Sequence, residues 1–248
     1  MKAVFFSSPG PSRLENEDGL FLSEILVDRD TKEPEYREIN PQSLVAVADG
    51  MGGGPGGREA AFLVLTKLSE LAHQPLTEAA QHLVEDNIKN AALALALVAQ
   101  RNPTLQQMGS ALSGLWLGQD QALAFNCGDC RVYRIREGFL DLLTQDHSLV
   151  YELYLNGQIT EEAMGAHPLK NILTSSIQDN PEPPRIFCRR IAVLPGDNFF
   201  LCSDGVWEAV SRREMEKWIA LEPTEGAPRL AETLLTRAKD NFTFLWLY

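Results

Sequence analysis

An apolar run that ends in Asp-Gly occurs twice in this chain of 248 residues, as VAVADG at residues 45–50 and as FFLCSDG at residues 199–205. The apolar residues predict buried strands, and the aspartate that follows each run, Asp49 or Asp204, is then held at the rim of the core. Taken singly, each Asp-Gly pair is also typical of a plain turn. The two runs therefore predict either two ordinary turns or two carboxylates held at fixed points.

The sequence around these runs changes between strand and helix patterns. Strands are expected at residues 20–27, 44–48, 113–117, 122–127, 131–136, 139–143, 186–193, 198–202 and 242–248. Helices are expected at residues 58–72, 77–101, 149–155 and 212–221, from Pro228 to Lys239, and in a short piece that starts at Thr160. The charged stretch 28–40 predicts a surface loop or hairpin tip, and the glycine-rich stretch 50–57 predicts irregular backbone.

Composition excludes several classes of protein. The chain is 44% hydrophobic and 23% charged, which is typical of a globular protein and not of a disordered or fibrous one. Its net charge of −12 argues against a nucleic-acid partner and against an anionic membrane. No internal repeat and no linker-like segment divides the chain. We therefore expect a single domain over residues 1–248, with the irregular stretch of about 147–184 forming a flap over a functional site.

No segment is expected to enter a membrane. The longest apolar run, Ala91–Ala99, has nine residues, about half of the ~20 that a spanning helix needs. The apolar stretch Ala3–Phe6 is too short for a signal peptide, so the sequence predicts a cytoplasmic protein with reduced thiols. Cys127 and Cys130 form a C-x-x-C, which suits a zinc knuckle or a redox dithiol; its place inside a strand pattern disfavours both.

Carboxylates at the ends of predicted elements suggest a metal site. Asp18 precedes the first strand and Asp240 precedes the last, in addition to the two Asp-Gly pairs. A set of oxygen ligands without a Cys/His cluster suits Mg²⁺ or Mn²⁺ and not Zn²⁺. Two such cations ~4 Å apart can lower the pKa of a shared water and orient it for attack on phosphorus. Arg13 is a candidate to hold phosphate oxygens, although a lone arginine is also typical of a solvated surface.

Six short motifs, in this order along the chain, resemble those of the bacterial metal-dependent serine/threonine phosphatases of type 2C. They are RLENED (13–18), VADGMGG (47–53), GDCRVY (128–133), TQDHS (144–148), LCSDG (201–205) and DNFT (240–243). The resemblance covers nearly the whole chain. It implies an α+β fold, a four-layer sandwich of two packed antiparallel β-sheets flanked by α-helices on both sides.

The resemblance also implies the ligands of two Mn²⁺ or Mg²⁺ ions. Asp49 would bridge the two ions, with the carbonyl oxygen of Gly50 on one of them. Asp204 and Asp240 would complete the shell of the other ion. By the same resemblance these three aspartates, together with Arg13, form the catalytic set.

Further roles follow from the same motifs. Glu17 and Asp18 would act on the metals largely through bound waters, and Arg13 would bind the substrate phosphoryl group. Asp129 resembles the ligand of a third, weaker metal near the flap. Cys127 and Cys130 would then only flank Asp129.

Some positions depart from the family pattern. Gly109–Ala111 stands where the family usually has Gly-Thr-Thr. Met51 stands where many eukaryotic members have a histidine that protonates the leaving group; methionine is usual in bacterial relatives, and the general acid is left unassigned. His147 and His167 lie in the flap region, where catalysis and local hydrogen bonding are open alternatives.

The resemblance predicts a protein phosphatase that hydrolyses phosphoserine and phosphothreonine with a water activated by two metals. Its partner would be a phosphorylated protein, itself the target of a Ser/Thr kinase, and the phosphatase is expected to be a monomer. Two alternatives stay open: a non-catalytic pseudophosphatase that binds phosphoproteins, and a hydrolase of small phosphate esters.

Overall fold

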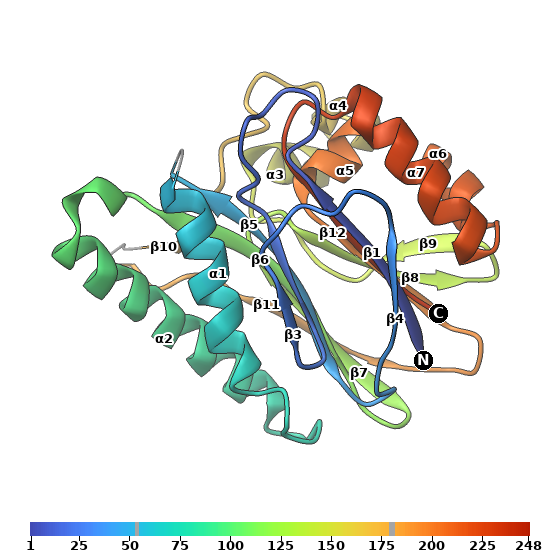
Figure 1. Cartoon of the computed structure of the whole chain (residues 1–248), viewed down its shortest axis with the longest axis horizontal. Helices are drawn as coiled ribbons and strands as arrows, with labels where there is room; N and C mark the ends of the chain where they lie inside the picture. The colour runs from blue at the N-terminus through green and yellow to red at the C-terminus, as the bar shows by residue number, and fades with distance from the viewer. Residues whose placement is uncertain (53–54, 179–181) are drawn as a thin grey trace.

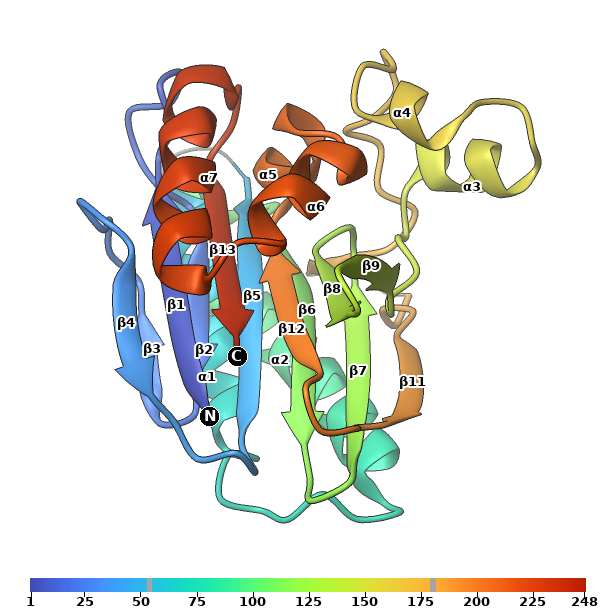
Figure 2. The ribbon, with the colours of Figure 1, turned by 90° about the vertical axis from the view of Figure 1, so that its right-hand side faces the viewer.

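The computed structural model describes residues 1–52, 55–178 and 182–248. Within these residues the strands form two antiparallel sheets that lie face to face (Figures 1 and 2). The first sheet has the order β4 (Glu35–Glu38), β1 (Lys2–Ser8), β13 (Phe242–Leu247), β12 (Asn198–Cys202), β8 (Arg131–Arg136) and β9 (Phe139–Leu142). The second has the order β11 (Phe187–Ala192), β7 (Gln121–Cys127), β6 (Gly109–Leu117), β5 (Leu44–Met51), β2 (Gly19–Leu22) and β3 (Ile25–Val27), with β10 (Ile177–Gln178) beside β6.

Helices cover the outer face of each sheet (Figure 2). On the second sheet lie α1 (Pro55–Ser69) and α2 (Ala80–Arg101), followed by the short 3-10 helix η1 (Pro103–Leu105). On the first sheet lie α5 (Asp204–Ala209), α6 (Arg212–Ile219) and α7 (Pro223–Arg237). The stripe of Val84, Ile88 and Leu95 explains α2, because spacings of three and four turn these buried side chains toward the sheet. The predicted α+β four-layer sandwich is confirmed.

The two inner faces of the sheets form a separate apolar core. Leu245 of β13 is fully buried there, opposite Phe5 of β1 and Leu201 of β12. Val47 of β5 and Leu115 of β6 meet them from the other sheet. Strands that are far apart in the sequence contribute to this core side by side, because β1 pairs with β13 along its whole length.

The N-terminal strands differ from the sequence-based expectation. The predicted strand 20–27 is a hairpin, in which Ser23 with a φ of 62° turns the chain between β2 and β3. The predicted loop 28–40 contains β4, a charged edge strand that pairs with β1. Charged residues are usual on edge strands, so the lack of apolar alternation hid it. β1 was not predicted at all.

Helix starts were also misplaced. α1 begins at Pro55, inside the glycine-rich stretch expected to be irregular, while Gly53 and Gly54 lie outside the described residues. α7 begins at Pro223, and Pro228, which was expected to open it, lies inside the helix. Asp204 opens the unpredicted helix α5, so the second Asp-Gly pair is a helix start and not a turn.

The flap segment contains two short helices, α3 (Leu149–Leu155) and α4 (Glu161–Met164), near the edges of both sheets (Figure 2). Its residues 179–181 lie outside the described part of the chain. Of the helices described, none has the length and apolar content that crossing a bilayer requires.

Shortening Leu245 tests the core between the sheets. Leu245→Ala is expected to lower the free energy of unfolding by about 2–5 kcal/mol, because the side chain is fully buried and its loss leaves a cavity. Leu235→Ala, on the outer side of α7 at 43% exposure, is the matched control and should change it by about 0.5 kcal/mol or less. Equal urea-unfolding midpoints for the two variants would contradict the assignment of the core.

Candidate functional site

Strand ends that carry predicted site residues meet at one end of the sandwich. Asp49 lies near the end of β5, and Asp204 begins α5, separated from the end of β12 only by Ser203. Cys202 of β12 pairs with Phe244 of β13, so the end of β12 lies beside the start of β13 and the preceding Asp240. Antiparallel pairing thus brings together carboxylates that are far apart in the sequence.

Two loops reach the same end. Gly19, the first residue of β2, pairs with Ala48, so Glu17 and Asp18 lie beside the end of β5. Asp129 lies in the short connection between β7 and β8, two strands that belong to different sheets. All predicted carboxylates therefore lie where the two sheets open toward the solvent.

These residues surround a cavity of about 220 Å³. Its lining consists of Arg13, Glu17, Asp49, Gly50, Met51, Gly52, Ala111, Asp129, Asn171, Leu173, Asp204 and Asp240. Asp18 is the one predicted site residue outside this lining, and it is buried at 2% exposure. Sequence reasoning missed Asn171 and Leu173 of the flap, because no local pattern separates them from their neighbours.

Asp18 is held by a hydrogen-bond network. The hydroxyl of Ser203 donates to Asp18 Oδ2 at 2.7 Å, and the backbone N–H of Thr243 donates to the Ser203 oxygen at 2.9 Å. Asp18 Oδ1 and Asp204 Oδ1 are buried oxygens without a hydrogen-bond partner among the described residues. Buried polar atoms are nearly always paired, so these two oxygens fit a cation or its water shell.

The amide of Asn241 fixes the loop that carries Arg13. Its oxygen accepts from the backbone N–H of Glu17 at 3.0 Å, and its nitrogen donates to the carbonyl oxygens of Glu15 at 2.9 Å and Pro9 at 3.2 Å. The sequence motif contained Asn241 but did not reveal this role, because the contacts join residues more than 220 positions apart.

Two glycines allow close backbone approach at the cavity. A Cβ on Gly50 would lie 2.1 Å from the carbonyl oxygen of Gly57, and a Cβ on Gly57 would lie 2.1 Å from Glu17 Oε2. Only glycine therefore lets the start of α1 pack against both the end of β5 and the carboxylate of Glu17.

The clustered carboxylates raise one another's pKa. Burial raises the pKa of Asp18 to about 8, and burial together with the charge of Asp204 raises those of Asp49 and Asp129 well above the ordinary value. Burial and then Asp240 raise the pKa of Asp204. A divalent cation would relieve this repulsion, because it favours the ionised carboxylates.

The donor set also indicates the kind of cation. The side chains of the cavity lining that could bind a cation are carboxylates and an amide, without a histidine or a cysteine among the described lining residues. Oxygen donors of this kind suit Mg²⁺ and Mn²⁺.

The backbone of Asp129 is held by a cluster that consists of Trp207, Arg131 and Asp146. The indole of Trp207 donates to the backbone oxygen of Asp129 at 3.0 Å, and the guanidinium of Arg131 stacks 3.8 Å above the indole ring. Arg131 in turn donates to both oxygens of buried Asp146, at distances of 2.6–3.1 Å. These contacts fix the backbone of the β7–β8 connection.

His147 fixes the same connection. Its Nδ1 accepts from the backbone N–H of Gly128 at 3.2 Å, and burial lowers its pKa to about 4. His167 Nδ1 accepts from the backbone N–H of Leu169 at 3.2 Å. Of the two alternatives, local hydrogen bonding is what the structure shows for both histidines.

The two cysteines of the C-x-x-C lie on either side of Asp129. Cys127 and Cys130 are free, buried thiols, and burial raises the pKa of both, that of Cys127 to about 12. Both side chains belong to the apolar interior of the fold.

Arg13 stands at the mouth of the cavity. Its Nη2 lies 2.7 Å from Asp240 Oδ2, and its side chain is 55% exposed. The hydrogen bond to Asp240 raises the pKa of Arg13, so the guanidinium is cationic at any physiological pH. A lone exposed cation beside a cluster of carboxylates is well placed to meet an incoming anion.

An ion pair joins the flap to helix α5. Lys170 of the flap contacts Glu208, which lies one turn after Asp204 on α5. Burial and the charge of Asp204 raise the pKa of Glu208 to about 7. Because Asn171 follows Lys170 directly, this ion pair sets where the flap meets the cavity.

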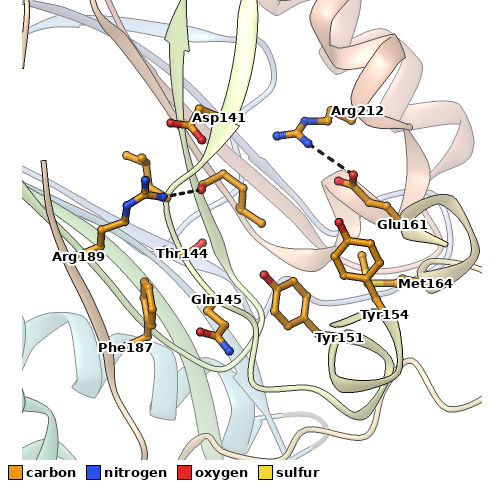
Figure 3. A pocket seen from close by; sticks show the side chains of 12 residues that line it. Asp141, Thr144, Gln145, Tyr151, Tyr154, Glu161, Met164, Phe187, Arg189 and Arg212 are labelled. Carbon is orange, nitrogen blue, oxygen red and sulfur yellow. Dashed lines mark hydrogen bonds and ion pairs between the residues drawn. The ribbon is translucent and has the colours of Figure 1, made fainter. Parts of the chain in front are cut away.

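A larger cavity, of about 350 Å³, lies between the flap helices and the edges of β9 and β11 (Figure 3). Its two carboxylates are neutralised: Asp141 lies 2.7 Å from Arg134, and Glu161 lies 3.5 Å from Arg212. Tyr151 contributes an apolar ring to the lining. This cavity therefore lacks the unbalanced negative charge that a cation site needs.

Comparisons with known proteins agree with this geometry. A family model described as "Protein phosphatase 2C" matches residues 31–236. The serine/threonine phosphatase stp of Listeria innocua is 30% identical over 258 aligned positions, which cover 99% of this chain and 94% of the relative.

Solved structures are similar over the same extent. The serine/threonine phosphatase PstP/Ppp of Mycobacterium tuberculosis superposes with a TM-score of 0.83 at 26% identity, covering 99% of this chain and 98% of that one. The catalytic domain of PstP, in a complex with two manganese ions, superposes with a TM-score of 0.79 at 25% identity, covering 99% and 98%.

The neutral imidazole of His147 predicts a pH dependence of stability. Because its pKa is about 4 in the folded protein and about 6.5 when unfolded, its stabilising contribution is complete above pH ~6.5 and is lost as the pH falls toward 4. The difference in free energy of unfolding between the native protein and His147→Asn should therefore shrink over this range.

Urea unfolding at several pH values measures that difference. Asn90→Ala, on the exposed side of α2, removes a side chain that does not titrate; it is the control and should give a difference that does not change with pH. A difference for His147→Asn that stays constant from pH 7 to 4 would contradict a buried neutral imidazole.

Proposed function

Because the chain belongs to the protein phosphatase 2C family, we propose that it hydrolyses phosphoserine and phosphothreonine in phosphoprotein substrates at the cavity of Asp49, Asp129 and Asp204. One observation carries the proposal. Carboxylates from both sheets converge on one cavity with Arg13 at its mouth, and among the described residues the buried Oδ1 of Asp204 in its lining has no hydrogen-bond partner.

Mn²⁺ or Mg²⁺ is the cofactor that this chemistry uses, and two such ions supply a water of lowered pKa together with positive charge beside the phosphoryl oxygens. We assign the binding of these ions to the carboxylates of Asp49, Asp204 and Asp240 and to the carbonyl oxygen of Gly50, which would hold them with oxygen donors. The presence of all four residues in the lining of one cavity supports this set.

Glu17 and Asp18 have a different place in the proposal. The carboxylate of Asp18 is buried and bound by Ser203, which supports a role through ordered water and charge and not through direct contact with substrate. Glu17 lines the cavity and fits the same role. We assign Asp129, on the separate β7–β8 connection, to a third and weaker ion.

Arg13 binds and orients the phosphoryl group in this proposal. Its planar guanidinium can donate two parallel hydrogen bonds to phosphoryl oxygens. The pair with Asp240 holds the side chain at the rim, so little rotamer freedom is lost when substrate arrives.

The intact carboxylate set supports turnover over mere binding. A pseudophosphatase has no need of Asp49, Asp204 and Asp240 in one place, whereas hydrolysis does. A hydrolase of small phosphate esters would use the same residues. The rates on a phosphopeptide and on nucleotides or sugar phosphates distinguish the two functions.

We propose further that residues 1–248 act as one catalytic domain with a flap at about 147–184. The pairing of β1 with β13 supports this, because it closes one sheet with both ends of the chain. We also propose that the enzyme acts as a monomer. The free cysteines are compatible with the reducing cytoplasm, where a Ser/Thr kinase would act on the same substrates.

The metal requirement is the first test of this function. Phosphate release from a phosphothreonine peptide should require Mn²⁺ or Mg²⁺, stop with excess chelator, and not be restored by Zn²⁺, because the donors are all oxygens. Release from nucleotides or sugar phosphates should be much slower. Undiminished turnover in chelator would overturn the metal-dependent account.

Asp49→Asn belongs to the same experiment. This substitution should lower kcat/KM by about a hundredfold or more. Changing a residue that only contacts a metal ligand typically lowers activity ~10–100-fold, and changing a ligand itself should cost more. Asp141→Asn, in the cavity beside the flap helices, is the matched control and should keep activity. Calorimetric titration with Mn²⁺ then separates loss of binding from loss of folding.

Arg13 gives the second test. Arg13→Ala should lower kcat/KM about ten- to a hundredfold, since charge-assisted hydrogen bonds contribute roughly 1.5–3 kcal/mol. Arg13→Lys should recover part of this loss, because the charge stays and the paired donors are lost. Arg229→Ala, an arginine of similar exposure that pairs with Glu225, is the control. Native kinetics for Arg13→Ala would make this arginine a surface charge only.

A further inference from the structure

The loop that carries Arg13 separates the catalytic cavity from a second hollow of about 690 Å³. Arg13 and Glu17 line the cavity, whereas Leu14, Glu15 and Asn16 between them line the hollow. Its other lining residues are residues 28–30, which follow β3, and Arg58, Glu59 and Phe62 of the first turns of α1. A chain whose phosphoryl group enters the cavity therefore passes directly beside the hollow.

Hydrogen bonds to its backbone hold the Arg13 loop in place between the cavity and the hollow. Asn241 binds the backbone of Glu15 and Glu17, and the N–H of Gly50 donates to the carbonyl oxygen of Glu17 at 3.2 Å. The hollow is thus a built feature next to Arg13 and not a gap under a loose loop.

Apolar side chains are exposed in the hollow. Leu14 is fully exposed, and Phe62 on α1 is 40% exposed. Large apolar side chains gathered beside a functional site are typical of a contact surface for a ligand or partner.

Carboxylates outnumber cations in the lining of the hollow, where Glu15, Asp28, Asp30 and Glu59 stand against Arg29 and Arg58. Arg58 lies 3.7 Å from Asp28, and Arg29 lies 2.8 Å from Glu35, which lies outside the hollow and also pairs with Arg37. Among the described residues no ion pair is found for Glu15, Asp30 or Glu59, and all three carboxylates are exposed. The hollow therefore presents exposed apolar side chains together with an excess of negative charge.

We propose that this hollow binds a lysine or arginine side chain of the substrate, within a few residues of the phosphorylated serine or threonine. Such a side chain matches both features: its hydrocarbon stem packs on Leu14 and Phe62, and its cationic end faces Glu15, Asp30 and Glu59. The inference rests on the proposed phosphatase function and names its substrate class, phosphoproteins with a basic residue near the phosphosite.

A set of phosphothreonine peptides tests this selectivity. The peptides differ only in one flanking residue, which is lysine, alanine or glutamate at each position up to three residues from the phosphothreonine. At one or two of these positions lysine should raise kcat/KM over alanine about five- to tenfold, as expected for a few solvent-exposed charge pairs. The preference should weaken in high salt, because exposed charges are screened.

Two variants assign the preference to the hollow. In Glu59→Gln combined with Asp30→Asn, the lysine-to-alanine ratio of kcat/KM should fall to about one; in Glu59→Lys it should reverse in favour of glutamate. Glu232→Gln, on the outer side of α7, is the matched control and should keep the ratio of the native protein.

Para-nitrophenyl phosphate, which has no flanking residue, separates the possible failures. If neither this ester nor any peptide is hydrolysed with Mn²⁺ present, the proposed function itself is wrong. If the ester and all peptides are hydrolysed without a flank preference, or if the preference survives in both variants, the hollow is not the binding site.

Discussion

The burial of like charges at one end of the sandwich is the constraint on which the site depends. Burial raises the pKa of Asp18, Asp49, Asp129 and Asp204, and the charge of a neighbouring carboxylate (Asp204 for the first three, Asp240 for Asp204) raises it further. A fold accepts such a cluster only where other charges balance it. Divalent cations provide that balance, so metal binding and the stability of this end of the molecule are thermodynamically linked.

Much of the surrounding structure holds these carboxylates in place. Ser203 binds Asp18, Asn241 binds the loop of Glu17, and Trp207 binds the backbone of Asp129. None of these partners carries a charge of its own, so each fixes geometry without reducing the negative potential. The cavity thereby stays both rigid and strongly attractive to cations.

The cavity is bordered by the flap on one side and by the Arg13 loop on the other. These two segments form the surface that a substrate would contact. On one side the flap is tied to α5 through Lys170 and Glu208, and Asn171 reaches the cavity. On the other side the Arg13 loop faces the hollow with exposed Leu14 and Phe62. Asp49, Asp204 and Asp240 lie beside strand ends fixed by two packed sheets, whereas Arg13, Leu14 and Asn171 lie on loops around them.

By itself the sequence determined the local elements and the chemistry of the site: the hairpin β6–β7, the helix α2, and the Asp-Gly ends that carry Asp49 and Asp204. These follow from short-range periodicity and from residue type, which are properties of neighbouring positions. Only the tertiary structure decided that β1 pairs with β13, that β4 is a strand, and that Asn241 binds the Arg13 loop. A period-two pattern says which face of a strand is buried but not which strand lies beside it. The β1–β13 pairing and the hydrogen bonds of Asn241 also join residues from opposite ends of the chain, which no local pattern can reveal.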